Sequence, residues 1–356
     1  MRIVRAEARL EELPLTRPYA IAGQPPIDRV GNVIVELETD SGVIGLGAGS
    51  PGEHVTGETI EACAGALTGE GLAWLAGRDA RHVPALCREA EARWPAAPAA
   101  RAAVDIALHD LLAKALGAPL CDILGRAHAA MPTSITIGIK PLDETLAEGV
   151  EYVARGFRCI KVKIGDELDA DLERLARLRE RVGARTTLRV DANVGYTVTE
   201  TRSFFERTAG LGLELVEQPV PRDAFGGLRE LPAAWRRAVA ADESLHGEQD
   251  ALALAAPEPL CGIYNIKLMK CGGVRPGMRI AAIAETAGIE LMWGCMDESR
   301  ISIAAALHAA FASPATRYLD LDGSLDLARD VVEGGFVLQD GVMRTTSEPG
   351  LGLRPA

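Results

Sequence analysis

The sequence lacks the features that mark membrane-spanning, secreted and nucleic-acid-binding proteins. No apolar run is long enough to cross a bilayer, and Glu7, Glu11 and Glu12 interrupt the stretch where a signal peptide would have its apolar core. Acidic residues outnumber basic ones by 50 to 38, which gives a formal charge of −12. Nucleic acids and anionic lipid surfaces require a basic partner surface. We therefore expect a cytoplasmic protein with neither a nucleic-acid nor a membrane partner.

Cysteine is also scarce. The seven cysteines are scattered, with no Cys-x-x-Cys pair and no Cys/His spacing typical of metal ligands. Scattered cysteines of this kind are usually free thiols that pack as small apolar residues in the core of a protein from a reducing compartment. The pattern therefore agrees with a cytoplasmic location.

Two different patterns of secondary structure follow one another along the chain. Apolar runs at 33–38 and 43–46 flank a Thr-Asp-Ser-Gly turn and predict a β-hairpin. The residues between 59 and 116 have helical spacing, and the clearest helix, over 99–116, ends at a Gly-Ala-Pro stop. Strands followed by helices predict a small α+β unit.

Beyond Met131, apolar strand-like runs alternate with helical segments. The starts of these runs lie roughly 25 residues apart, which is enough for one strand, one helix and two short loops. Eight such runs predict a closed parallel barrel. An open doubly wound sheet is less favoured because no Gly-x-Gly-x-x-Gly follows the first strand. The predicted strands cover 133–138, 159–164, 187–191, 213–217, 238–242, 262–268, 289–294 and 317–320.

Acidic residues stand at the ends of three consecutive predicted strands. Asp191, Glu217 and Asp242 close the third, fourth and fifth strands, and the carboxyl ends of barrel strands meet at one mouth. Three carboxylates so close repel one another unless a cation lies between them. Oxygen ligands without a nearby Cys or His favour Mg²⁺. Any one of these acids could instead cap the following helix, but three in succession favour a metal site.

Lysines stand at the ends of the second and sixth strands. Lys161 and Lys163 alternate with Val162 and so face one side of their strand, which in a barrel is the interior. Two neighbouring ammonium groups lower each other's pKa, which makes one of them a usable base near neutral pH. Lys267 ends the sixth strand, across the mouth. Two opposed amines are what inversion of a carbon through a planar intermediate requires.

Further charged residues follow the sixth and eighth strands. Lys270, three residues after Lys267, is expected in a loop, with a structural or phosphate-binding role. Asp320 and Asp322 end the eighth strand, and aspartates at i and i+2 project from one face, where they could hold an ammonium group. An Asp-rich turn is the alternative interpretation of this pair.

Taken together, these motifs resemble the enolase superfamily, whose sites use Lys or His bases with Mg²⁺. The Lys-x-Lys pair with the sixth-strand lysine is similar to the muconate-cycloisomerase-like subgroup, and Asp320-Leu-Asp322 resembles the Asp-x-Asp motif of dipeptide epimerases. The resemblance covers essentially the whole chain. The motifs that carry it are Lys161-Val-Lys163, Asp191-Ala-Asn193, Glu217-Gln-Pro219, Ala241-Asp242-Glu243-Ser244, Asn265-Ile-Lys267 and Gly272-Gly273.

The resemblance implies an α/β fold, a (β/α)7β TIM-like barrel with an N-terminal α+β capping domain. The capping domain would span residues 1–125 and the barrel 126–325, and a C-terminal segment over 326–356 would return to the capping domain. It also implies an isomerase that inverts the α-carbon of the C-terminal residue of a dipeptide through an ene-diolate.

The same resemblance assigns roles to individual residues. The metal ligands for Mg²⁺ would be Asp191, Glu217 and Asp242. Lys163 and Lys267 would exchange the α-proton on opposite faces, and Lys161 would stabilise the enolate oxygen. Asp320 and Asp322 would hold the free α-ammonium of the substrate. The full set of expected substrate contacts is Gln24, Thr136, Lys161, Cys295, Asp297, Asp320 and Asp322.

Three departures from the Ala-Glu epimerase pattern bear on the substrate. Gln24 stands where those enzymes have an arginine, and Asp297 replaces an apolar residue. The acid of their Gly-x-Gly-Glu motif is missing, since the residues over 45–48 are Gly-Leu-Gly-Ala. Losing a cation and gaining an anion disfavours an acidic side chain. We therefore expect a dipeptide with a neutral, hydrophobic or basic side chain.

Other functions are compatible with these residues. An N-acylamino acid racemase, an o-succinylbenzoate synthase or a cycloisomerase would use the same metal and lysines, and only Asp320 and Asp322 argue against them. Less favoured are a Schiff-base aldolase acting through Lys267 and a non-catalytic binding protein. The sequence leaves a homo-oligomer open.

Overall fold

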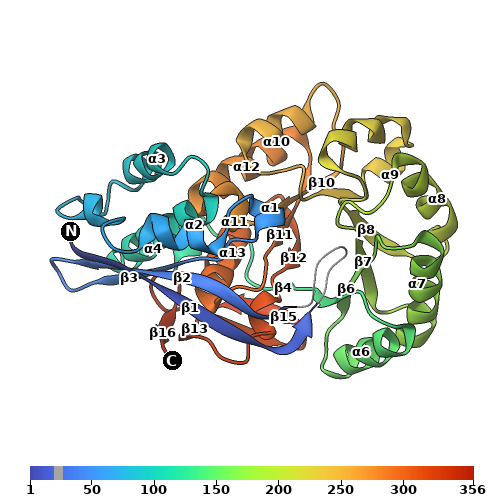
Figure 1. The fold of residues 1–356 in the computed structure, drawn as a ribbon, viewed down its shortest axis with the longest axis horizontal. Helices are drawn as coiled ribbons and strands as arrows, with labels where there is room; N and C mark the ends of the chain where they lie inside the picture. Colours follow the sequence, from blue (N-terminus) through green and yellow to red (C-terminus); the bar gives the residue numbers. More distant parts are fainter. Residues whose placement is uncertain (20–26) are drawn as a thin grey trace.

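The N-terminal part of the computed structural model, which describes residues 1–19 and 27–356, is an antiparallel sheet packed against helices (Figure 1). Its strands are β1 (Ile3–Tyr19), β2 (Ile27–Thr39) and β3 (Ile44–Gly49), in that order. β2 and β3 pair around a turn in which the Gly42 amide donates to the Thr39 carbonyl, so the predicted hairpin is confirmed. Strand β1 was not predicted because ion-paired charged residues interrupt its apolar residues, as where Arg5 contacts Glu38.

Helices follow this sheet in sequence, as expected of an α+β unit. The predicted helix over 99–116 is α4 (Pro98–Ala115), and Gly117 beyond its end takes a φ of 69°. Proline is tolerated in the first turn because its missing N–H would have no helical partner there. The other helical segments are α1 (Glu53–Thr56), α2 (Ile60–Leu67), the 3₁₀ turn η1 (Ala73–Leu75), α3 (Val83–Arg93) and α5 (Leu120–Leu124).

Strand β3 approaches helix α4 more closely than side chains would permit. Its alternate residues Gly45, Gly47 and Gly49 face the helix, whose contacting residues Ala99, Ala103 and Ala107 repeat every four positions. A Cβ on the middle glycine would lie 1.8 Å from the Ala103 carbonyl oxygen. Every second residue of the strand and every fourth residue of the helix thus form one seam of small residues, because side chains repeat with a period of two in a strand and 3.6 in a helix.

From Ile135 to Asp320 the chain forms an eight-stranded sheet in which every neighbouring pair is parallel. Each predicted strand is present, and its bounds differ from the prediction by at most two residues. The strands are β5 (Ile135–Ile137), β6 (Cys159–Lys163), β7 (Thr187–Asp191), β8 (Leu213–Glu217), β9 (Val239–Ala241), β10 (Ile263–Ile266), β11 (Glu290–Gly294) and β12 (Thr316–Asp320).

The sheet closes into a barrel. Just before β5, Thr133 forms a parallel bridge with Leu319 of β12, and the Ser134 amide donates to the Leu319 carbonyl at 3.1 Å. The predicted (β/α)7β barrel with an N-terminal α+β capping unit is therefore confirmed. Its helical connections are α6 (Leu142–Ala154), α7 (Leu168–Val182), α8 (Val198–Thr208), η2 (Arg222–Glu230) with α9 (Ala233–Arg236), α10 (Glu248–Ala255), α11 (Leu268–Cys271) with α12 (Val274–Ala287), and α13 (Arg300–Phe311).

Helix length and composition also bear on membrane insertion. Among the helices of residues 1–19 and 27–356, none combines the length and the apolar character that a membrane crossing needs.

The parallel register places charged strand ends side by side. Lys163 on β6 pairs laterally with Asp191 on β7, which pairs with Glu217 on β8. Two residues earlier in the strands, Thr136 on β5 pairs with Lys161 on β6. Because neighbouring strands lie about 4.8 Å apart, these side chains gather at one mouth of the barrel.

The C-terminal residues return to the N-terminal sheet, beside which the red strands lie in Figure 1. The Ala328 amide donates to the Pro14 carbonyl at 2.8 Å, and the Leu351 amide donates to the Asp110 carboxylate of α4 at 2.8 Å. The domain boundaries expected after residues 125 and 325 stay a prediction. The short elements are η3 (Gly323–Leu325), β13 (Val332–Gly334) paired with β16 (Leu353–Pro355), and β14 (Phe336–Gln339) paired with β15 (Val342–Thr345), which also pairs with β4 (Met131–Pro132).

The glycine seam between β3 and α4 generates a stability prediction. Gly47→Ala forces a Cβ against the Ala103 carbonyl, so we expect a loss of about 3 kcal/mol in the free energy of unfolding, measured by denaturant titration. The matched control is Gly65→Ala in α2, where a Cβ meets nothing within 4 Å. That variant is expected to be neutral or stabilised by about 0.5–1 kcal/mol. Equal stability of the two variants would contradict the close packing.

Candidate active site at the barrel mouth

A cavity of about 450 Å³ lies where the barrel strands end, and both the barrel and the capping unit line it. The capping unit contributes residues of β2 and of the segment over 50–61. Gln24 lies outside the residues that the structure describes, so its substrate contact stays a prediction. The other residues predicted to touch the substrate or exchange its proton all line the cavity: Thr136, Lys161, Lys163, Lys267, Cys295, Asp297, Asp320 and Asp322.

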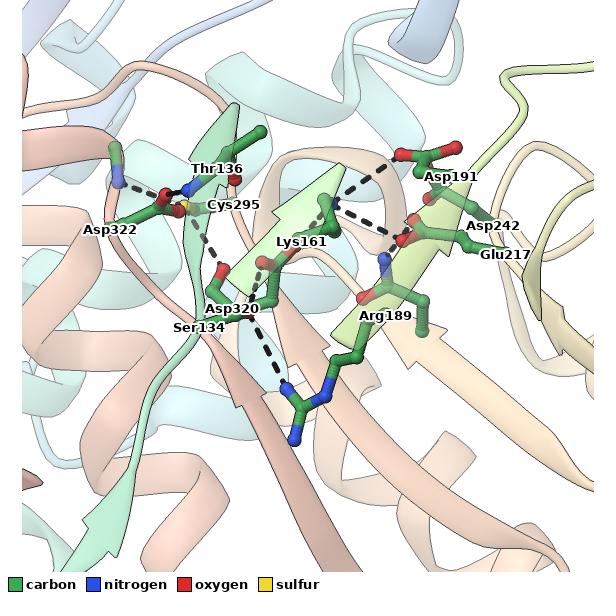
Figure 2. Close-up of polar contacts among 12 residues, drawn as sticks. Ser134, Thr136, Lys161, Arg189, Asp191, Glu217, Asp242, Cys295, Asp320 and Asp322 are labelled. Atoms are coloured by element: carbon green, nitrogen blue, oxygen red, sulfur yellow. Dashed lines mark hydrogen bonds and ion pairs between the residues drawn. The ribbon is translucent and has the colours of Figure 1, made fainter. Parts of the chain in front are cut away.

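The three predicted metal ligands are carboxylates buried next to this cavity. Asp191 and Glu217 are the last residues of β7 and β8, Asp242 follows β9, and each has an exposed fraction of 0%. Lys161 contacts two of them, at 3.4 Å to Asp191 and 3.2 Å to Glu217 (Figure 2). Asn265 donates to the other Glu217 oxygen at 2.6 Å. Such pairing is required because an isolated charge is costly to remove from water.

The electrostatics of these carboxylates fit a divalent cation. Burial and repulsion from Asp191 raise the pKa of Glu217 to about 8, so the cluster resists carrying its full negative charge. Burial and repulsion from Asp242 raise the pKa of the adjacent Glu243 to about 7, and one Glu243 oxygen is buried without a hydrogen-bond partner among the described residues. A cation among these oxygens would relieve both effects, and oxygen-only ligands suit Mg²⁺.

The lysines occupy the carboxylate oxygens that a cation would use. Within residues 1–19 and 27–356, no group of three or more Asp, Glu, His or Cys side chains is arranged to hold a metal ion as it stands. Instead, Asp191 accepts from Lys163 at 2.6 Å and Asp242 accepts from Lys267 at 2.8 Å. A bound cation would replace these ammonium groups as the counter-charge, which would release the amines toward the cavity.

Lys163 and Lys267 face the cavity from opposite sides of the barrel. Lys163 is the last residue of β6, and Lys267 directly follows β10. Three strands separate β6 from β10 in either direction around the closed sheet. Both side chains are almost fully buried, yet both line the cavity. The structure therefore places amines on two sides of one cavity.

The expected mutual lowering of lysine pKa values is wrong for Lys161. Burial disfavours its ammonium form, but the carboxylates of Asp320, Glu217 and Asp191 outweigh burial and raise the pKa well above its ordinary value. The pKa of Lys267 is also raised, because nearby carboxylates outweigh burial there too. Only the neighbouring lysine is visible in the sequence, whereas the barrel register surrounds each amine with acids from other strands.

Lys270 was expected in a loop, and this expectation is wrong. It lies in the one-turn helix α11, and its buried amine contacts Asp242 at 2.5 Å. The chain has six lysines against 32 arginines, and four of the six pair with the strand-end carboxylates. That scarcity is the signal in the sequence that could have identified Lys270 as part of the site.

The two aspartates of the Asp-x-Asp motif have different partners. Asp320 forms an ion pair with Lys161 through one oxygen and accepts from the Ser134 hydroxyl through the other at 2.6 Å (Figure 2). Asp322 accepts from the Thr136 amide at 2.7 Å. Both aspartates therefore line the cavity, but the carboxylate of Asp320 is already shared by two donors of the protein.

Arg189 and Cys295 hold the end of β12 in place (Figure 2). Arg189 donates to the Leu319 carbonyl at 2.7 Å, and the Cys295 thiol donates to the Asp320 carbonyl at 3.2 Å. The Gly323 amide donates to the Cys295 sulfur at 3.3 Å. Arg189 is not among the predicted site residues, although its position two residues before a predicted strand-end ligand places it on the same interior face.

One corner of the cavity is acidic. Burial and repulsion from Asp322 raise the pKa of Asp297 to about 7, and burial and repulsion from Asp297 raise the pKa of Asp326 to about 6. Burial and Asp320 likewise raise the pKa of Asp322 to about 7. Asp326 was not predicted, because only the fold brings the residue after η3 back to the cavity. Acids that repel one another around a space form a site for a cation or a basic group.

Comparison with known proteins agrees with this geometry. Residues 144–356 match the enolase C-terminal domain-like family, and residues 6–125 match the N-terminal domain of the mandelate racemase / muconate lactonizing enzyme family. An L-Lys-D/L-Arg epimerase of Methylococcus capsulatus is 60% identical, with 99% of each chain covered. An L-Lys-D/L-Arg epimerase of Desulforapulum autotrophicum is 56% identical, with 97% of each chain covered.

A solved structure supports the same family. The crystal structure of a dipeptide epimerase from Methylococcus capsulatus, complexed with Mg and the dipeptide L-Arg-D-Lys, has a TM-score of 0.97 to this chain at 61% identity, with 99% of each chain covered. The chain therefore belongs to the enolase superfamily and, within it, to the dipeptide epimerases, which are isomerases.

Proposed function

We propose that this protein is a magnesium-dependent epimerase of dipeptides with basic side chains. It inverts the α-carbon of the C-terminal residue by moving a proton between two lysines. The observation that carries the proposal is the placement of Lys163 and Lys267 on opposite sides of one cavity. The names of the similar epimerases and the ligands of the similar crystal structure support the metal and the substrate class.

In this proposal Asp191, Glu217 and Asp242 hold Mg²⁺. When bound, the ion supplies Lewis-acid stabilisation of the negative charge that develops on the substrate carboxylate. The protein contributes a buried, oxygen-only ligand set on three adjacent strands. Lys161 adds a fixed positive charge beside the same carboxylates, and its raised pKa keeps it charged at neutral pH.

Lys163 and Lys267 act as the two acid/base groups. The neutral amine of one removes the α-proton, and the ammonium group of the other delivers a proton to the opposite face of the planar carbon. Both lysine side chains are almost fully buried, yet both line the cavity into which a substrate would bind. In the reverse direction the two lysines exchange roles.

The charge of the cavity favours a basic substrate. Among the described residues, seven Asp or Glu side chains line the cavity against four Lys or Arg side chains. We assign the acidic corner formed by Asp297 and Asp326 to a basic side chain of the dipeptide, and Asp320 and Asp322 to its free α-ammonium. Charge-assisted hydrogen bonds of this kind are roughly twice as strong as neutral ones.

The alternatives receive less support. An N-acylamino acid racemase, an o-succinylbenzoate synthase or a cycloisomerase would have no free α-ammonium group for Asp320 and Asp322 to hold, and the similar proteins described above are named epimerases. A Schiff-base aldolase acting through Lys267 would not need three buried carboxylates at the ends of adjacent strands. A binding protein without catalysis would not need amines on both sides of the cavity.

The cellular setting is also part of the proposal. All seven cysteines are free thiols, which agrees with a reducing compartment such as the cytoplasm. We assign no nucleic-acid or membrane partner, because the net charge is −12. Assembly into a homo-oligomer stays a prediction.

Removing either acid/base lysine tests the proton transfer. Lys163→Ala and Lys267→Ala are each expected to lower epimerisation by at least about 100-fold, the contribution of one general acid/base. Each variant should still exchange the α-proton of one epimer with D₂O, followed by mass spectrometry, because the other lysine is intact. Lys114→Arg in the capping unit is the control and should retain epimerisation. Full activity in either alanine variant would exclude the two-base mechanism.

Magnesium should bind and stabilise the folded protein. At 100 times its dissociation constant the ion should add about 2.7 kcal/mol to the free energy of unfolding, which raises the melting temperature by several degrees. EDTA should remove both the shift and the activity. Asp191→Asn should lose most of the shift, because it removes a carboxylate ligand. A wild-type protein whose melting temperature ignores Mg²⁺ would contradict the metal site.

The acidic corner should determine side-chain preference. Asp297→Asn and Asp326→Asn should each raise KM about 10-fold or more for Lys- or Arg-containing dipeptides, the loss of one charged hydrogen bond, with little change for neutral dipeptides. The exposed Glu173→Gln on α7 is the control.

The raised pKa values of these acids add a pH dependence. Asp326 and Asp297, with pKa values of about 6 and about 7, become anionic as pH rises through this range. The ratio of kcat/KM for a basic dipeptide to kcat/KM for a neutral one should therefore increase from pH 5.5 to 7.5 and flatten in the Asn variants. Strong preference for an acidic dipeptide would refute the assignment.

A further inference from the structure

Lys270 is a buried lysine that the proton-transfer mechanism does not use. Its exposed fraction is 3%, and it does not line the cavity. Its amine lies 2.5 Å from the Asp242 carbonyl, 2.5 Å from the Asp242 Oδ1 atom and 3.1 Å from the Asn265 carbonyl. A lysine ammonium has three N–H donors, so these three contacts use its full donor capacity. Lys270 is therefore fixed between the ends of β9 and β10.

Lys267 and Lys270 share one carboxylate but differ in their surroundings. Lys267 contacts the Asp242 Oδ2 atom at 2.8 Å and lines the cavity. Lys270 contacts the Oδ1 atom and does not line the cavity. The single turn of α11 produces this arrangement, because residues three apart lie on one face of a helix. Asp242 is thus held from two directions by amines of the same turn.

The capping unit fixes the end of this turn. Gly272 and Gly273 adopt φ values of 96° and 119°, and their amides donate to the Leu268 carbonyl at 2.9 and 3.0 Å. The carboxylate of Asp105 in α4 accepts from the Val274 amide at 2.6 Å, at the start of α12. A Cβ on Gly273 would lie 2.4 Å from that carboxylate. The amine of Lys270 therefore has little freedom to move to the cavity.

We propose that Lys270 is a positioning residue that holds Asp242 in the orientation needed to bind the divalent cation. This inference rests on the proposed metal site. Lys267 faces the cavity, where the proposed function assigns its amine to the substrate, so Asp242 needs a second partner. Lys270 lies outside the cavity lining and contacts the Oδ1 atom of that carboxylate, which leaves the Oδ2 atom for the cation. Partners behind a metal ligand commonly orient it in this way.

Replacing the ammonium by an uncharged chain of similar length tests the inference. Mg²⁺ is expected to raise the melting temperature, and the Mg²⁺ concentration that gives half of this increase is the midpoint. Lys270→Met should raise the midpoint by about 10–100-fold, the loss of affinity typical when a metal ligand loses its hydrogen-bonding partner. Exchange of the α-proton in D₂O should fall by the same factor for both epimers, and excess Mg²⁺ should restore it. Loss of a base would instead affect the two epimers unequally. A purely structural role would lower the melting temperature without moving the Mg²⁺ midpoint.

Two comparisons keep the result decisive. Lys270→Gln is measured alongside Lys270→Met, because the amide is polar and retains hydrogen-bond donors without the charge. If the melting temperature of the wild-type protein does not respond to Mg²⁺, the metal site is refuted. If it responds but the midpoint is unchanged in the variants, only the role of Lys270 is refuted. Failure of both variants to fold in saturating Mg²⁺ would also refute it, since the bound cation would itself compensate the charge of Asp242.

Discussion

The site depends on buried charges, each of which is stable only because a charge of opposite sign lies next to it. Asp191, Glu217 and Asp242 are completely buried at the ends of adjacent strands, and lysine amines provide their counter-charges. Removing one partner would leave a charge without compensation in a medium of low dielectric. The barrel makes this cluster possible, since its parallel register brings residues far apart in sequence to one mouth. The same charges that constrain the fold can then bind a cation and transfer a proton.

The capping unit completes the site in two ways. The segment over 50–61 and strand β2 line the cavity together with the barrel mouth, where the lysines lie. Helix α4 packs closely on the glycines of β3 at one side and, through Asp105, caps helix α12 at the other. This helix connects the outer sheet with the turn that carries Lys267 and Lys270. A capping unit of this kind is therefore a structural support for the chemistry as well as a cover.

The strand-end carboxylates and lysines lie in a different part of the fold from the acidic corner. The carboxylates and lysines lie at strand ends within the barrel, where the register fixes their spacing. The acidic corner at Asp297 and Asp326 lies in segments beyond β11 and β12, outside the regular sheet. Residues in such segments can change without disturbing the barrel. In the proposed function, the residues for proton transfer and those for side-chain preference thus lie in different parts of the fold.

The sequence alone determined the strands, the strand-end charges and the family resemblance. Strands of a closed parallel barrel are buried on both faces, so they appear as apolar runs that stop where a charged residue reaches the mouth. Tertiary structure decided the raised pKa of Lys161, the pairing of Lys270 with Asp242 and the approach of Asp326 to the cavity. Each of these depends on the distance between side chains on different strands or loops. Coulomb energy falls with that distance, and a linear sequence does not contain it.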